Sequence, residues 1–235
     1  MTELLSGCLA QEGPGAPPLR RVVLAGNTVM QHLFAGLPVA SIAAAPFAPL
    51  SLFDGDTGDR LLGAPLYYAP CVAGYVGGDI TAGLLASGLW QRPGQHLFLD
   101  LGTNGEMALL SGGTIYCCAT AAGPAFEGVG ISCGSGAVPG AIDAVTADGD
   151  ALRVRVIGGG RARSLCGSGL LDAVAALRQL ERVEDSGFTE EDALPLAPGV
   201  TLLRRDIRAF QLAKSAICAG AETLLHTAEN GRAHV

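Results

Sequence analysis

The chain has few charges and few aromatic side chains for its length. Only 16% of its 235 residues are charged and 5% are aromatic. No run of lysine and arginine interleaved with aromatic residues is present, and the formal net charge is −7. Binding to nucleic acid needs clustered cations that neutralise phosphates, so the composition argues against a nucleic-acid partner.

The seven cysteines do not have the spacing of a metal site or of a disulfide framework. None of them forms a Cys-x-x-Cys pair, and their number is odd. The sequence therefore predicts no zinc or iron–sulfur ligand set. We expect most of the thiols to be small core residues.

Signals for export and for membrane insertion are also missing. The N-terminus has Glu3 and no basic segment of the kind that opens a secretory signal. Residues 107–126 are uncharged over twenty positions, but glycines, Pro124 and several hydroxyls interrupt the stretch. We expect a buried β-hairpin there, no membrane partner and a cytoplasmic location.

Glycine and apolar residues are abundant, which indicates an α/β protein with many turns and a substantial core. The chain has 34 glycines and is 49% hydrophobic. Periodicity and capping residues predict helices at 3–10, 28–35, 80–87, near Ala141, at 170–180 and from Asp206 to about Asn230. Apolar runs predict a buried strand at 21–25, a short strand from Tyr67, and a strand at 152–157. The stretch from Pro38 to Pro70 is expected to be mostly loop.

The most informative stretch is Phe-Leu-Asp-Leu-Gly-Thr-Asn-Gly at residues 98–105. An apolar strand ends in Asp100 and runs into Gly102-Thr103-Asn104-Gly105. Glycine lets backbone N–H groups approach oxyanions, Thr103 and Asn104 add side-chain donors, and Asp100 can hold a divalent cation through water. A second apolar run follows and turns at Gly112-Gly113, so the segment predicts a β-hairpin. Walker and Rossmann loops both open a helix, so neither matches.

A strand, a DxGTN turn and a second strand resemble the phosphate-binding hairpin of the actin, sugar kinase and Hsp70 ATPase superfamily. The flanking sequence narrows this resemblance to the ATPase portion of the reductive activators of corrinoid proteins, over roughly residues 20–228. Six blocks appear in order: GNTVMQHL at 26–33, GGDITAG at 77–83, DLGTNGE at 100–106, AAGPAFEG at 121–128, LCGSGL at 165–170 and QLAKSAI at 211–217.

The resemblance implies an actin-like ATPase (ribonuclease H-like, ASKHA) α/β fold with mixed sheets and flanking helices. We expect an incomplete version, because the family's N-terminal iron–sulfur domain, first DxGTT hairpin and C-terminal adenine-binding strand have no counterpart. Residues 1–90 would be part of the first lobe and 91–235 the second, C-terminally truncated. ATP and Mg²⁺ are the implied cofactors, with an iron–sulfur cluster only in the absent domain. A corrinoid protein is the implied partner, and a homodimer is a further expectation.

Two acids are the candidate catalytic residues. In the superfamily's sugar kinases, an Asp in the position of Asp79 takes the proton of the attacking hydroxyl. In an ATPase the same carboxylate would orient water or bind magnesium through water. Alternatively, Asp79 is only the N-cap of its helix. Glu127 stands between glycines and either faces the cleft, binding metal or ribose, or faces solvent from a surface loop.

Several other residues are candidate nucleotide contacts. Gly167-Ser168-Gly169 at a helix start can present free N–H groups to a phosphate or ribose, or form a serine N-cap between turn glycines. Lys214 can reach ribose or phosphate, or extend into water. Asn27 and Thr28 are either helix caps or cleft contacts. Asp100 and Asp79 are the candidate metal ligands.

Three functions remain open from the sequence. The first is ATP-dependent reductive activation of a corrinoid protein, with ATP hydrolysis coupled to uphill electron transfer to cobalt. The second is a small-metabolite kinase of the acetate or sugar type, and the third is a non-catalytic fragment. The passage from Gly123 to Gly140 offers few polar groups for an acceptor substrate beyond Glu127, which favours an ATPase over a kinase.

Overall fold

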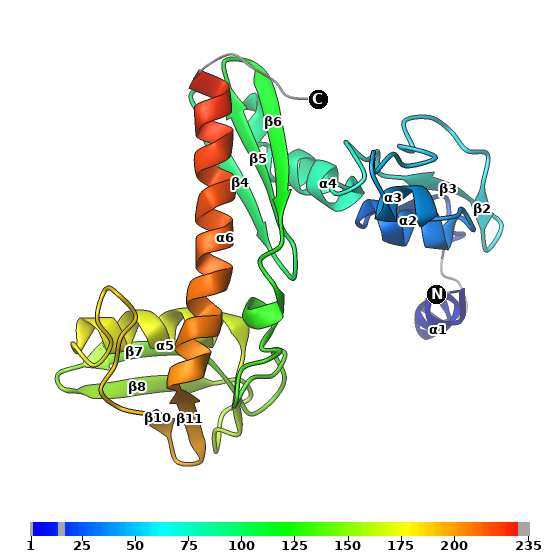
Figure 1. Ribbon diagram of the computed structural model, residues 1–235. Helices are drawn as coiled ribbons and strands as arrows, with labels where there is room; N and C mark the ends of the chain where they lie inside the picture. Colours follow the sequence, from blue (N-terminus) through cyan, green and yellow to red (C-terminus); the bar gives the residue numbers. More distant parts are fainter. Residues whose placement is uncertain (1, 14–16, 230–235) are drawn as a thin grey trace. The chain divides into compact units, whose positions relative to one another are not determined.

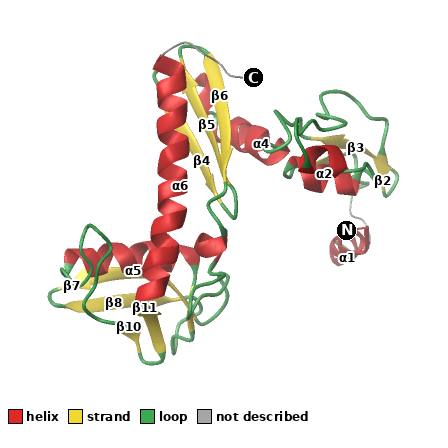
Figure 2. Ribbon diagram, in the orientation of Figure 1, coloured by secondary structure: helices red, strands yellow, loops and turns green. Residues whose placement is uncertain are grey.

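The computed structural model describes residues 2–13 and 17–229 and divides the chain into two compact units. The first unit takes in residues up to Phe98 together with Leu110–Cys118, and the second takes in Leu99–Leu109 together with residues from Ala119 on. Helices and small sheets occur in both (Figures 1 and 2). The α/β prediction is therefore confirmed. Within the described ranges, no helix has the length and apolar character needed to cross a membrane.

The first unit is built around a three-stranded sheet of order β1-β3-β2. Strand β1 (Val22–Leu24) is parallel to β3 (Ala64–Tyr68), and β2 (Arg60–Leu61) is antiparallel to β3. Its helices are α1 (Thr2–Gln11), α2 (Thr28–Phe34), α3 (Ala40–Ala43), α4 (Gly78–Ser87) and the 3₁₀ turn η1 (Leu89–Gln91). The helices predicted at 3–10, 28–35 and 80–87 are present, with ends that differ by at most two residues.

Two strand predictions in this unit need correction. Strand β3 begins at Ala64, inside the stretch predicted to be loop. Ala64, Leu66 and Tyr68 are buried and alternate with exposed residues, so Pro65 lies on the outward face of the strand. Strand β1 is only half-buried, because Val23 is 63% exposed on the side away from the small core.

The DxGTN segment lies where predicted, between two consecutive strands of a sheet. Strands β4 (His96–Leu101), β5 (Gly105–Ser111) and β6 (Thr114–Thr120) form a sheet of order β4-β5-β6. Gly112 and Gly113 join β5 to β6 with φ of 58° and 81°, a conformation that favours glycine. Strand β5 is buried almost throughout and β6 is partly exposed, so the hairpin prediction is confirmed.

The larger core belongs to the second unit. Strands β7 (Ala141–Asp148), β8 (Ala151–Val156) and β9 (Ser164–Leu165) form a sheet of order β8-β7-β9, and β10 (Ala193–Ala197) pairs with β11 (Val200–Leu203). The core also receives side chains from η2 (Pro124–Glu127), α5 (Gly167–Gln179) and α6 (Arg204–Glu229), the long helix that follows β11 (Figure 1). The β10–β11 hairpin was not predicted.

The helix predicted near Ala141 is wrong, because this segment is β7. The Gly149-Asp150 turn leads the chain back into β8, and β7 also pairs with β9, so two partners fix it as a central strand. The predicted strand at 152–157 corresponds to β8. Helix α6 begins two residues before the predicted start, and Ile207, Phe210 and Leu224 are buried on one face. Its predicted end at Asn230 lies outside the described residues.

Candidate functional site

The turn between β4 and β5 gathers five of the predicted site residues. Asp100 is the next-to-last residue of β4 and is exposed. The N–H of Gly102 donates to the carbonyl oxygen of Asn104 at 3.2 Å, and the carbonyl of Thr103 accepts from the N–H of Gly123 at 2.9 Å. The turn is therefore closed on itself and tied to the segment that begins η2.

Gly105 is required by packing rather than by a close approach to a ligand. A Cβ atom added to Gly105 would lie 2.0 Å from Cδ1 of Ile217 and 2.7 Å from Oγ1 of Thr120. Real Cβ atoms do not approach that closely. The glycine therefore allows α6 to pack directly against the start of β5.

Glu127 lies against the turn. The N–H of Thr103 donates to Oε1 of Glu127 at 3.2 Å, and the Thr103 hydroxyl donates to Oε2 at 2.5 Å. Both side chains are exposed, so the pair lies at the surface. Two donors of the DxGTN turn thus already bind one pair of anionic oxygens.

The start of α5 packs directly on η2. A Cβ atom on Gly167 would lie 1.7 Å from the carbonyl oxygen of Phe126, and one on Gly169 would lie 2.2 Å from the carbonyl oxygen of Ile142. Both glycines are therefore required by backbone packing. This contact places the first turn of α5 next to the 3₁₀ turn that ends at Glu127.

The interpretation of Ser168 as the N-cap of α5 is wrong. Cys166 is the N-cap and makes no side-chain capping hydrogen bond, whereas Ser168 is the second residue of the helix. The Ser168 hydroxyl donates to the carbonyl oxygen of Asp143 at 2.9 Å. The Arg155 guanidinium hydrogen-bonds the Asp143 carboxylate at 2.9 Å, which lowers the pKa of Asp143. Within the described part of the chain, the N-cap residue gives the first amides of α5 no side-chain hydrogen bond.

Asp206 connects the loop after Glu127 to the start of α6. Its carboxylate is fully buried and accepts from the N–H of Leu203 at 2.8 Å, and from the N–H and hydroxyl of Ser132, each at 3.0 Å. Arg205 donates to the same Ser132 hydroxyl. The sequence predicted Asp206 only as a helix start, because nothing local links it to Ser132.

Lys214 lines a pocket of about 210 Å³ between the end of α5, the loop after it and α6. Arg178 and Asp185 form an ion pair on its wall. The amide of Gln211 donates to the carbonyl oxygen of Ser186 at 2.7 Å, which fixes the loop against α6. The ammonium group of Lys214 is exposed, so it can reach a ligand in this pocket.

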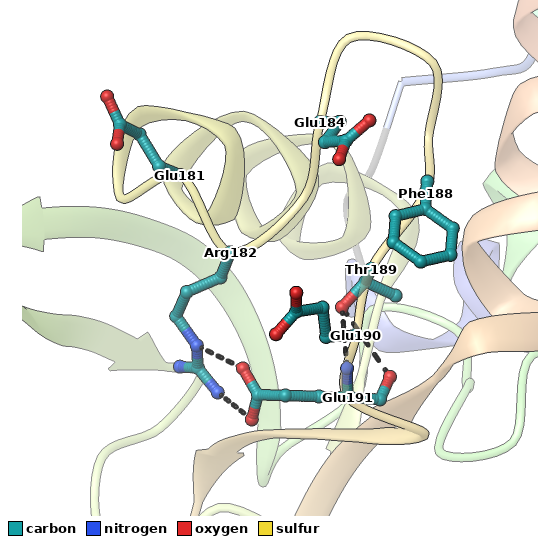
Figure 3. A pocket seen from close by; sticks show the side chains of 7 residues that line it. All are labelled: Glu181, Arg182, Glu184, Phe188, Thr189, Glu190 and Glu191. Carbon is teal, nitrogen blue, oxygen red and sulfur yellow. Dashed lines mark hydrogen bonds and ion pairs between the residues drawn. The ribbon is translucent and has the colours of Figure 1, made fainter.

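A second hollow, of about 280 Å³, lies on the other side of that loop and is strongly acidic. Figure 3 shows Arg182 and Glu191 joined at one end of it and Phe188 at the other. The two hydrogen bonds between Arg182 and Glu191 are both 2.8 Å, and they lower the pKa of Glu191. No predicted site residue lines this hollow.

Among the described residues, no group of three or more His, Cys, Asp or Glu side chains could hold a metal ion.

Asn27, Thr28 and Asp79 come together in the first unit. Asn27 is the N-cap of α2, and its side chain accepts from the N–H of Met30 at 2.9 Å. The N–H of Asp79 donates to the carbonyl oxygen of Gly26 at 3.2 Å. A Cβ atom on Gly77 would lie 2.5 Å from Cα of Asn27, so the two sequence blocks touch through their backbones.

The interpretation of Asp79 as the N-cap of α4 is wrong. Gly77 occupies that position, and Asp79 is the second residue of the helix, with Oδ1 accepting from the N–H of Ile80 at 2.9 Å. Thr28 is buried, and its hydroxyl donates to the carbonyl oxygen of Ala73 at 2.6 Å. The Thr28 side chain therefore supports the fold of this region.

Gln31 is a buried polar residue of this region that the sequence did not single out. Its Nε2 donates to the carbonyl oxygens of Gly26 and Ala69 at 3.1 and 3.0 Å, and contacts Sγ of Cys71 at 3.0 Å. Within the described residues, its Oε1 has no hydrogen-bond partner. Burial raises the pKa of the Cys71 thiol. A glutamine inside the apolar run of α2 was the signal that could have identified it.

The fold and the hairpin turn, together with the matches that follow, make the chain a protein of the actin-like ASKHA class. The family described as the C-terminal domain of RACo, the ASKHA domain, matches residues 94–234, and the one described as the RACo middle region matches residues 1–92. The chain belongs to the RACo family.

Similar proteins are longer than this chain. The corrinoid activation enzyme RamQ of Eubacterium limosum is 30% identical over 254 residues, which cover 94% of this chain and 42% of that protein. The Co(II) methylated amine-specific corrinoid protein reductase of Methanosarcina barkeri is 31% identical over 178 residues, which cover 66% of this chain and 33% of that protein. A solved structure, the reductive activator for a corrinoid, iron-sulfur protein, has a TM-score of 0.83 and 33% identity, with 97% of this chain and 41% of that chain covered. The chain thus spans less than half the length of these relatives.

Proposed function

We propose that the chain is the ATPase part of a reductive activator of corrinoid proteins, in which ATP hydrolysis drives uphill electron transfer to cobalt. The observation that carries the proposal is the DxGTN turn, where Thr103 directs two donors at one pair of anionic oxygens. A turn that binds a carboxylate in this way has the donors that a phosphate group needs. Membership of the RACo family supports the corrinoid partner.

The residues present fit a magnesium nucleotide. Mg²⁺ is commonly held by one or two carboxylates with water and phosphate oxygens, so the proposed protein ligands are Asp100 in the second unit and Asp79 in the first. The bound ion would neutralise charge on the phosphates. The donors for the phosphates are Gly102-Thr103-Asn104-Gly105 and the uncapped first turn of α5, Gly167-Ser168-Gly169.

The same proposal includes the remaining candidate contacts. Lys214 reaches ribose or phosphate from its pocket on α6. Glu127 binds ribose or metal-bound water once it releases Thr103. Asp79 orients the attacking water, and Asn27 and Thr28, which follow the Gly26 carbonyl that accepts from the N–H of Asp79, contact the nucleotide.

The wider organisation is part of the same proposal. The boundary between the two functional regions lies near residue 91. The partner is a corrinoid protein, the chain works in the cytoplasm, and a homodimer is its assembly.

Calorimetry with Mg-ADP tests the nucleotide site. The chain should bind with a dissociation constant above the micromolar range, and Asp100→Asn should weaken binding by about tenfold or more, because a charged metal contact is lost. Asp150→Asn, on the exposed turn between β7 and β8, is the matched control and should bind as the parent does. Equal affinity in the Asp100 and Asp150 variants would remove Asp100 from the site.

A further inference from the structure

A separate cavity of about 240 Å³ lies in the first unit, away from every residue assigned to the nucleotide. Its walls come from two segments, the η1 turn with the residues that follow it, and the β5–β6 turn. The amide of Gln95 donates to the hydroxyl of Ser111 at 2.8 Å and so joins the two segments. A cavity of about 150 Å³ is enough for benzene, so this one has room for a substituted ring.

The lining combines apolar and aromatic side chains with two hydroxyl groups, those of Ser111 and Thr114, and one cation. Leu110 is 8% exposed and forms the closed side, whereas Trp90 and Ile115 are 52% and 47% exposed at the mouth. An exposed tryptophan beside aliphatic side chains offers a flat apolar surface for stacking. The ring of a ligand would displace water from these surfaces.

Arg92 carries the only charge among the described residues that line the cavity. None of the ion pairs found within the described part of the chain includes it. Residues 110–115, which supply the opposite wall, contain no charged residue. The cavity therefore has one uncompensated positive charge and complements an anion. Arginine presents a planar fork of donors that matches a carboxylate in a bidentate manner.

We propose that this cavity binds a small planar carboxylate, an aromatic ring that bears one carboxyl group. The ring stacks on Trp90 between Leu110 and Ile115, and the carboxylate pairs with Arg92. This site does not depend on nucleotide binding and would exist even if the chain bound no ATP.

The chain supplies its own probe, because Trp90 is its single tryptophan. Titration with benzoate should change the Trp90 fluorescence in a saturable manner. Benzyl alcohol, which has the ring without the charge, should bind about tenfold more weakly, and benzylamine, with the opposite charge, should give no saturable change. A response to benzylamine equal to that of benzoate, or no saturation with benzoate, would overturn the proposal.

Two arginine variants locate the charge. Arg92→Gln should weaken benzoate binding by about tenfold, whereas Arg153→Gln, which changes an exposed side chain of β8, should leave it unchanged. Circular dichroism establishes that each variant is folded. Equal benzoate affinity in a folded Arg92→Gln variant would contradict the assignment. If that variant does not fold, the three ligands tested on the unaltered chain decide the question.

Discussion

The proposed catalytic role of Asp79 can be tested apart from its structural role in α4. Because Gly77 is the N-cap of α4, the helix does not depend on the Asp79 side chain for its cap. The backbone of Asp79 is fixed by its hydrogen bond to Gly26. A conservative change of the side chain can therefore test catalysis without unfolding the helix.

Asp79→Asn should lower kcat for ATP hydrolysis by roughly tenfold to a thousandfold and leave KM unchanged, because the role proposed for the carboxylate lies mainly in the transition state. Steady-state hydrolysis with and without a corrinoid protein measures this. Asp59→Asn, an exposed acid of the same unit, is the control and should keep the parental rate. An unchanged kcat in Asp79→Asn would leave Asp79 as an acid that only favours the helix N-terminus.

The cysteines differ in burial, and we expect them to differ in reactivity for that reason. The prediction that most thiols lie in the core holds for Cys71 and Cys166, whereas Cys8 and Cys218 are exposed. Burial raises the pKa of Cys71 and, together with its neighbour Cys118, raises that of Cys117. A raised pKa means less thiolate at a given pH, and the thiolate is the reactive form.

Brief treatment with iodoacetamide at neutral to mildly alkaline pH should therefore modify Cys8 and Cys218 well before Cys71 and Cys117. Mass spectrometry of the peptides gives the order, and the difference should narrow as the pH rises towards the raised pKa values. Treatment in denaturant should make the rates similar. Equal rates for Cys71 and Cys218 in the folded chain would contradict this order.

At the level of elements, glycines set how closely α5 can approach η2. Gly167→Ala would place a methyl group against the carbonyl oxygen of Phe126, so we expect a loss of about 1–3 kcal/mol in the free energy of unfolding. Gly136→Ala is the matched control, because a Cβ there meets nothing within 4 Å and its φ is not in the left-handed region. Urea denaturation compares the two. Equal midpoints would show that α5 can shift away from η2 at little cost.

The start of α6 depends on Asp206. Asp206→Ala removes the acceptor for Leu203 and Ser132, and we expect a loss of about 3 kcal/mol or more, because hydrogen bonds to a buried charge are among the strong ones. Ser132→Ala removes only the hydroxyl bonds and should cost about 1 kcal/mol. Thermal unfolding of both variants tests the ranking. A smaller loss in Asp206→Ala than in Ser132→Ala would reverse it.

Local signals predicted the elements whose determinants are adjacent in sequence. The β4–β5 turn and the start of α5 were found because glycines and apolar runs mark them directly. The strand β7 was mistaken for a helix because its partners β8 and β9 come later in the chain, and pairing overrides local preference. The contacts of Glu127 with Thr103 and of Asp206 with Ser132 join residues 24 and 74 positions apart, and no local pattern reports them.

For the molecule as a whole, the predicted site residues fall in both compact units. Asp100, Glu127 and the start of α5 belong to the second unit, whereas Asn27 and Asp79 belong to the first. If the second unit holds the nucleotide and Asp79 acts at the terminal phosphate, the two units should respond to different parts of the ligand.

Hydrogen exchange can separate these responses. Mg-ADP should slow amide exchange at residues 102–105 and 167–169, and a slowly hydrolysed ATP analogue should extend the protection to residues 26–28 and 77–80. Residues 151–156 of β8 serve as the internal control and should not change. Protection of the first unit by Mg-ADP alone would contradict the division of roles.

Helix α6 is a long, stiff element of the second unit. Its 26 residues correspond to a rod of about 39 Å. Its first half, as far as Lys214 and Ser215, forms one wall of a pocket, and further along Gly220 lies against Met107 and Thr120, where a Cβ would meet Met107 Cε at 2.5 Å. A stiff helix held at two places along its length transmits a tilt at one place to the other. Fifteen residues of α6, about 22 Å of helix, follow Lys214, so a tilt of about ten degrees at the pocket would shift the end of the helix by roughly 4 Å and would change the contact of Gly220 with Met107.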